Sequence, residues 1–126
     1  ILALDPDNKV ILTRSGDAYR NTGDYKTAVE YYNKALDIAF DVYAALGLAL
    51  ICKGEGKYEE AAERLSNLIR NDIKNYRLYI DLADCYIKLN RKQDAVSALE
   101  NFQKQGIRCP PISDMLDKLK NNKPIY

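Results

Sequence analysis

The chain has 126 residues, of which 29% are charged and 47% hydrophobic, and its formal net charge is +1. These values are typical of a globular protein with no preference for nucleic acid or anionic membranes, and no apolar run reaches the roughly 18 residues that insertion into a membrane requires. The sequence has no histidine, the commonest general acid–base and metal ligand, so we expect no catalytic residue, metal or other cofactor.

Residues 1–8, ILALDPDN, are typical of the last turn of a helix followed by a stop. Asp5 and Pro6 provide the stop, because proline cannot continue a helix and disfavours the helical conformation of the residue before it. These residues match the end of the second helix in the repeated pattern described below. We therefore predict that residues 1–8 are the end of a preceding repeat. We therefore expect the chain to be a fragment of a longer protein.

From residue 9 onward one pattern occurs three times, and each copy contains two stretches with apolar residues at helical spacing. Ala28, Ala61 and Ala95, in the second stretch of each copy, recur at intervals of 33 and 34 residues. Turn residues such as Gly23 and Asn90 separate the stretches, because they end a helix readily. The pattern predicts helical hairpins that stack, since one hairpin cannot bury its apolar face alone. The predicted hairpins span residues 9–40, 41–74 and 75–109.

Small residues at matching positions are predicted to let neighbouring helices approach closely. A glycine within a helix costs up to about 1 kcal/mol relative to alanine, which is tolerated where a larger side chain has no room. The repeat-packing residues are Gly16, Gly47 and Ala83 in the first helices and Ala28, Ala61 and Ala95 in the second. Seven of the ten tyrosines are interpreted as packing residues and not as a platform for nucleic-acid bases: Tyr19, Tyr25, Tyr32, Tyr43, Tyr58, Tyr79 and Tyr86.

The repeated pattern resembles the tetratricopeptide repeat family, whose consensus is W-x-x-L-G-x-x-Y followed by A-x-x-x-F over about 34 residues. The first copy has Ser15-Gly16-x-x-Tyr19 in this register, and Leu12, Tyr43 and Tyr79 stand where the family often has tryptophan. The resemblance implies an all-α, right-handed superhelical solenoid of antiparallel helix-turn-helix hairpins. It also implies a non-catalytic scaffold or adaptor that binds a protein or peptide segment on its concave face.

The second copy is irregular, because Ala35 and Gly47 are 12 residues apart where a regular array needs about 15. We predict a tight turn around Ala39 to Asp41, with Asp41 as the N-cap of the next helix. The alternative is a pair of helices fused through this region.

A short helix is predicted after the third copy, where Ile112, Met115, Leu116 and Leu119 form one apolar stripe. Ser113 is the expected N-cap. Residues 110–126 are predicted to be a capping helix and tail that cover the last hairpin, as terminal elements of repeat proteins do. The alternative is that residues 112–119 begin a fourth repeat.

The three cysteines, Cys52, Cys85 and Cys109, are widely spaced and form no Cys-x-x-Cys motif. We interpret them as unpaired thiols, which slightly favours a reducing compartment such as the cytoplasm. A disulfide between Cys52 and Cys85 is the alternative.

The resemblance implies that the first helix of each hairpin lines a partner-binding groove. Spacing from the small packing residues predicts the groove residues, which are Arg14, Asp17, Arg20, Ala44, Leu48, Ile51, Cys52, Arg77, Asp81, Asp84 and Lys88. Four of them, Ala44, Leu48, Ile51 and Cys52, are expected to form an apolar floor with a mixed-charge rim. The alternative is that a neighbouring segment or the C-terminal tail covers this strip.

The two-carboxylate clamp of chaperone-binding family members is not expected, because Asp17 and Asp81 stand in its slots and repel a carboxylate. Asp81 and Asp84 are interpreted as a surface that meets a basic stretch of a partner. Two other functions stay open at this point: an interaction arm of a larger enzyme or of a secretion or envelope machine, and self-association through exposed end hairpins.

Overall fold

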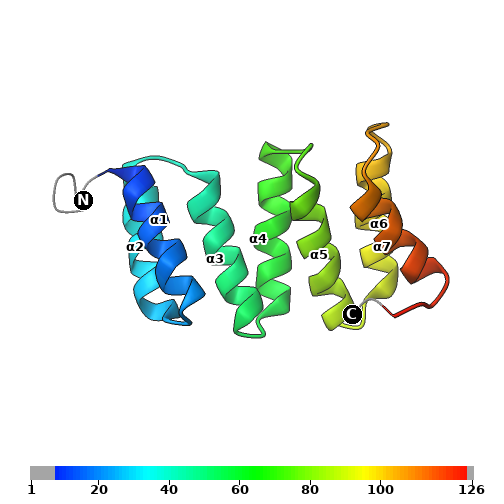
Figure 1. Ribbon diagram of the computed structural model, residues 1–126, viewed down its shortest axis with the longest axis horizontal. Coiled ribbons are helices and arrows are strands. Elements are labelled where there is room, and N and C mark those ends of the chain that lie inside the picture. The colour runs from blue at the N-terminus through cyan, green and yellow to red at the C-terminus, as the bar shows by residue number, and fades with distance from the viewer. Residues whose placement is uncertain (1–7, 125–126) are drawn as a thin grey trace. The chain divides into compact units, whose positions relative to one another are not determined.

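The structure is a computed structural model that describes residues 8–124. Within this range the chain forms α-helices and no strand, which confirms the predicted all-α class (Figure 1). The helices are α1 (Lys9–Asn21), α2 (Tyr25–Ile38), α3 (Val42–Gly54), α4 (Tyr58–Asn71), α5 (Tyr76–Lys88), α6 (Lys92–Gln103) and α7 (Pro110–Lys120). The predicted end of a preceding repeat, Ile1 to Leu4 with Asp5 and Pro6, lies outside the described residues.

The chain divides into two compact units, and each is described by itself. The N-terminal unit extends to Gly56 and contains α1, α2 and α3, which pack on one another. The C-terminal unit begins at Lys57 and contains α4 to α7, in which each helix packs on the next. The boundary falls inside the predicted hairpin 41–74, so this hairpin contributes one helix to each unit.

The helices begin and end where local chemistry favours it. The side chains of Asn8, Asp41 and Asn75 each accept a hydrogen bond from a backbone N–H in the first turn of the following helix. After α1, α3 and α5 the chain turns through left-handed backbone conformations at Gly23 (φ 86°), Gly56 (φ 81°) and Asn90 (φ 61°). These are the predicted stops, and glycine and asparagine adopt this conformation at the lowest steric cost.

The connection between α2 and α3 is the predicted tight turn. It consists of Ala39, Phe40 and Asp41, and the Asp41 side chain accepts a hydrogen bond from the backbone N–H of Tyr43 at 2.9 Å. The predicted N-cap is therefore confirmed, and α2 and α3 are separate helices.

The core of the N-terminal unit is built around Tyr32, whose side chain is fully buried. Its ring lies against α1 at Gly16 and against α3 at Gly47. A Cβ atom on Gly16 would lie 2.6 Å from the ring, and one on Gly47 would also collide with it. Both glycines therefore stand where helices meet a large side chain. The surrounding core residues are Leu12, Ala28, Ala35, Ala44 and Ile51.

The core of the C-terminal unit joins α5, α6 and α7 (Figure 1). Phe102 packs edge-to-face on Tyr79, with ring centroids 5.1 Å apart, and the three buried apolar residues of α7 complete the cluster: Ile112, Leu116 and Leu119. The predicted apolar stripe thus covers the last hairpin. The alternative that α7 begins a fourth repeat stays untested.

The predicted N-cap of α7 is wrong. The helix begins at Pro110, so Cys109 is the N-cap residue. Ser113 is the fourth residue of the helix. Proline suits the first helical position, because its backbone angle is already helical and its missing N–H has no partner to lose there.

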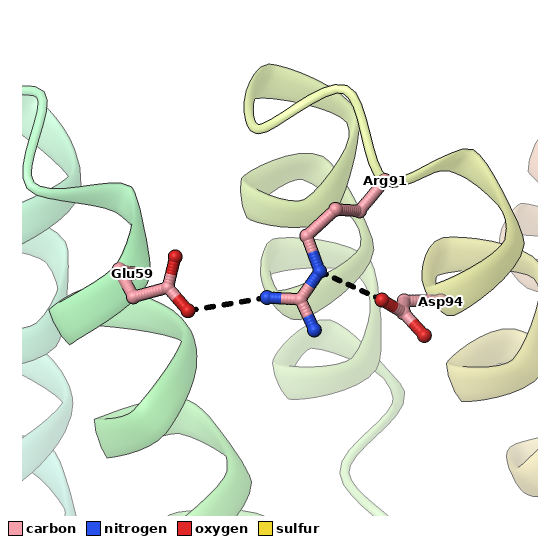
Figure 2. Close-up of polar contacts among 3 residues, drawn as sticks. All are labelled: Glu59, Arg91 and Asp94. Carbon is pink, nitrogen blue, oxygen red and sulfur yellow. Dashed lines mark hydrogen bonds and ion pairs between the residues drawn. The ribbon is translucent and has the colours of Figure 1, made fainter.

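Arg91 joins the starts of α4 and α6 on the surface of the C-terminal unit, as Figure 2 shows. Its guanidinium contacts Glu59 at 3.2 Å and Asp94 at 2.7 Å, and it lies 4.8 Å from the centre of the Tyr86 ring. All three charged side chains are largely exposed, so this network contributes little to stability.

Two of the seven tyrosines interpreted as packing residues are exposed. Tyr43 is 69% exposed, and Tyr19 is 38% exposed and stacks on Tyr31 with centroids 5.4 Å apart. The interpretation is wrong for Tyr43, because α3 turns Ala44 and Gly47 toward the core and its neighbour Tyr43 away from it.

All three cysteines are buried thiols, so the alternative Cys52–Cys85 disulfide does not form. Among residues 8–124, no helix is both long and apolar enough to span a bilayer.

Candidate partner-binding site

An open depression of about 510 Å³ lies on the N-terminal unit, between α1 and the start of α3. It contains two of the predicted groove residues, Arg14 and Asp17. Its lining consists of Lys9, Val10, Thr13, Arg14, Asp17, Asp41 and Tyr43.

The floor of the depression is a buried hydrogen bond between α1 and the α2–α3 turn. The hydroxyl of Thr13 donates to Asp41 at 2.7 Å, and both side chains are almost completely buried. Because Asp41 also accepts from the backbone of Tyr43, its carboxylate is occupied on both oxygens. The start of α3 is thereby tied to the middle of α1.

Asp17, another residue of the lining, is held in place by contacts with Tyr32 and Arg20. The hydroxyl of Tyr32 donates to Asp17 at 2.5 Å, and Arg20 lies 3.6 Å from the same carboxylate. Arg20 also donates to the Tyr32 hydroxyl at 3.0 Å. Burial, and then the hydrogen bond to Asp17, raise the pKa of Tyr32 to about 12. The charge of Asp17 is therefore compensated within the unit.

The rim of the depression is apolar and exposed. Val10 is 52%, Phe40 61% and Tyr43 69% exposed. The Lys9 ammonium donates to the backbone oxygen of Phe40 at 3.4 Å, which places the α2–α3 turn beside the start of α1. We call Val10 and Tyr43, which line the depression, the apolar rim, and Phe40 adjoins it through its backbone oxygen. Large apolar side chains gathered at an open depression are typical of protein-binding surfaces.

The predicted apolar floor on α3 is wrong. Ala44 is fully buried, and Ile51 and Cys52 are 3% and 8% exposed. Ala44 and Ile51 belong to the core around Tyr32, and the half-buried Leu48 packs against it, so α1 and α2 already cover most of this strip. The physical reason is that Gly47 itself faces the Tyr32 ring, so Ala44 and Ile51, three and four residues away on the same side of the helix, also face the core.

The remaining predicted groove residues lie on α5 in the C-terminal unit. Arg77 and Lys88 are exposed, whereas Asp81 and Asp84 are half-buried. Their part in binding stays a prediction. The described residues of this unit do have a second depression, of about 440 Å³ between α4 and α6, but none of the predicted residues lines it.

The repeat spacing does not identify Phe40 or Lys9, and it places Tyr43 in the core. The signal that would have found them is the missing length between Ala35 and Gly47, which leaves aromatic residues on both sides of a short turn. Within residues 8–124 there is no group of three or more cysteine, aspartate or glutamate side chains that could hold a metal ion.

Two models of the tetratricopeptide repeat match the chain, one over residues 11–42 and the other over residues 54–106. The chain belongs to the tetratricopeptide repeat family. As a tetratricopeptide repeat chain with this all-α fold, it is a protein–protein interaction module.

Similar proteins include the RNA polymerase-associated protein CTR9 of Saccharomyces cerevisiae, which is 28% identical over 102 residues. That match covers 75% of this chain but 9% of CTR9, so the chain spans a small part of this relative. A tetratricopeptide repeat protein of Parabacteroides merdae has the same fold, with a TM-score of 0.76 and 24% identity over 96% of this chain and 48% of that one. The Yersinia enterocolitica type III secretion chaperone SycD, in complex with a peptide of the translocator YopD, has a TM-score of 0.77 and 22% identity over 95% of this chain and 99% of that one.

Proposed function

We propose that this module captures an extended segment of a partner protein in the depression between α1 and α3. The observation that carries the proposal is the contrast between its rim and its floor. Tyr43 and Val10 are exposed on the rim, whereas the polar groups of the floor already have partners. A partner's apolar side chains can bind there without leaving a buried polar group of the module unpaired.

The same geometry supports a non-catalytic role. Asp41 is occupied by Thr13 and by the Tyr43 backbone, and Asp17 is occupied by Tyr32 and Arg20. A general base needs an oxygen free to accept a proton from a substrate. Asp41 does not meet this need, and Asp17 meets it with one oxygen at most, because Tyr32 and Arg20 both contact its Oδ1.

The relatives support capture of a peptide. The SycD structure holds a peptide of YopD, and a yeast Sti1 structure that shares the fold is a complex with pHSP90. Both proteins are less than 25% identical to this chain, so they support the class of ligand and not its identity.

The proposal is tested by selecting peptides from a random 12-residue display library against the whole chain and measuring their affinity by fluorescence anisotropy. Tyr43→Ala should weaken binding by about tenfold, because exposed aromatic side chains at interfaces carry much of the binding energy. Tyr19→Ala is the matched control, since Tyr19 is another exposed tyrosine of the same unit. It should change the affinity by less than about twofold.

A second pair of variants tests the charged part of the lining. Arg14→Ala should weaken binding, and Lys26→Ala, an exposed cation on α2, should not. If the selected peptides bind with the same affinity to Tyr43→Ala, Arg14→Ala and the parent chain, the partner site lies elsewhere and the proposal is wrong.

A further inference from the structure

We propose that the segment bound at this depression is acidic as well as apolar, with a carboxylate placed at Lys9 and Arg14 and an apolar side chain on the apolar rim. This inference rests on the proposed function and adds the chemistry of the partner. Its basis is the charge that the depression leaves uncompensated.

The two carboxylates of the depression already have hydrogen-bond partners within the module. Asp17 receives the Tyr32 hydroxyl at 2.5 Å and has Arg20 at 3.6 Å. Asp41 is 9% exposed and receives the Thr13 hydroxyl and a backbone N–H. Arg20 is the only charged group among these partners, so Asp41 keeps its negative charge. Counted with Lys9 and Arg14, Arg20 leaves the depression with one more cation than carboxylates.

The two cations are available. Arg14 is exposed and makes no hydrogen bond or ion pair with another described residue. Lys9 uses one of its three N–H donors on the neutral Phe40 carbonyl, at 3.4 Å, and forms no ion pair within residues 8–124. No acidic residue stands in the first turn of α1 to offset them.

The helix to which both cations belong adds to the same field. Lys9 is the first residue of α1, where the partial positive charge of the helix dipole disfavours a cation and favours an anion. An incoming carboxylate would relieve this unfavourable arrangement. The positive potential and the apolar rim adjoin, since Val10 lies between the two cations in sequence and also lines the depression.

This arrangement differs from the two-carboxylate clamp, which occurs in chaperone-binding members of the family and is not expected in this chain. The clamp slots of the first repeat hold Thr13 and Asp17, both of which are engaged inside the module. The carboxylate would instead be bound at the edge of the depression, beside the turn that precedes α3. A single acidic side chain flanked by apolar residues meets this need better than a doubly charged chain end.

The test uses three synthetic peptides in which one central Glu, Gln or Lys residue is flanked on each side by the same Leu and Phe residues. Their affinities for the whole chain are measured by fluorescence anisotropy. The Glu peptide should bind about tenfold more tightly than the Gln peptide at about 0.05 M salt, and the difference should shrink at about 0.5 M salt. The Lys peptide should bind most weakly.

A charge reversal separates this proposal from the previous one. Arg14→Glu should make the Lys peptide bind more tightly than the Glu peptide, while Tyr43→Ala should weaken all three peptides equally. If the three peptides bind alike and all lose affinity with Tyr43→Ala, the site is right and the acidic preference is wrong. If none of them responds to Tyr43→Ala, both proposals are wrong.

The chain also contains its own acidic and apolar segment at residues 1–7, and the last arm tests it as an alternative occupant. Asp5 and Asp7 are replaced by Asn in the whole chain. An unchanged affinity for the Glu peptide supports a partner segment as the occupant. A gain of more than about tenfold would mean that the chain's own residues compete for Lys9 and Arg14, and the proposal would be overturned.

Discussion

The buried hydroxyl of Tyr32 donates a hydrogen bond of 2.5 Å to Asp17, a residue that lines the open depression on the N-terminal unit. The ring of the same tyrosine fills the space left by Gly16 and Gly47, on two different helices. One core side chain therefore determines how closely α1 and α3 approach it, and it also donates a hydrogen bond to a carboxylate that lines the site. Packing and surface chemistry are coupled through this residue.

Replacing Tyr32 with Phe should destabilise the chain by about 1–2 kcal/mol, because Asp17 and Arg20 lose a partner while the ring remains. The free energy of unfolding is measured by urea denaturation. Tyr31→Phe is the control, since the Tyr31 ring stacks on Tyr19 at the surface. Equal stability of the two variants would show that the buried hydroxyl contributes nothing.

Stability should fall at alkaline pH, because the pKa of Tyr32 is raised to about 12 in the folded state from about 10 in the unfolded chain. The folded state thus holds its proton more tightly, so this contribution is complete below pH 10 and is lost as the pH rises toward 12. At pH 11 the loss should be about 1 kcal/mol. Urea denaturation at pH 9 and pH 11 measures it, and Tyr32→Phe should show a smaller decrease between these two values.

Gly47→Ala should destabilise the N-terminal unit by about 1–3 kcal/mol, because the new methyl group collides with the Tyr32 ring. The Tyr32 hydroxyl is held by Asp17, so the ring cannot move aside. Gly54→Ala is the matched control on the same helix. Its methyl group would meet only the hydroxyl end of the half-buried Tyr25 side chain, at 2.5 Å, which can shift. Thermal unfolding should show a lower midpoint for Gly47→Ala alone, and a midpoint unchanged by it would contradict this packing.

Thr13→Val should cost about 1–3 kcal/mol, since it leaves the buried Asp41 carboxylate without its side-chain donor at nearly the same volume. Thr27→Val provides the comparison, because Thr27 is a half-buried threonine on α2. A double-mutant cycle with Asp41→Ala should give a coupling energy of about 0.5–3 kcal/mol. Additive effects in urea denaturation would mean that the 2.7 Å contact has no energetic weight.

Much of the fold follows from local chemistry that the sequence displays directly. Gly23, Gly56 and Asn90 end helices because they adopt the left-handed conformation easily, and Asp41 begins α3 because it caps the backbone. The three-fold pattern identifies the family, since each hairpin needs the same small and large residues to stack. These features depend on a few neighbouring residues, so spacing alone is enough to predict them.

The candidate site was predicted only in part. Arg14 and Asp17 do line the depression, but Ala44 and Ile51 lie in the core and Tyr43 lies on the surface. A residue's direction on a helix changes by about 100° at each step, and Ala44 and Ile51 lie three and four residues from Gly47, on the side of α3 that packs on Tyr32. Which face that is depends on the fit of Tyr32 against Gly47, a contact between residues on two helices.

The sequence by itself therefore determined the helices, their turns and the family, because each depends on short-range spacing and backbone preference. The tertiary structure decided which side of α3 is buried, how Tyr32 donates a hydrogen bond to Asp17, and where Lys9 and Arg14 adjoin an apolar rim. These outcomes arise from packing between helices that are distant in sequence. In such packing, a shift of one position along a helix moves a side chain from the core to the surface.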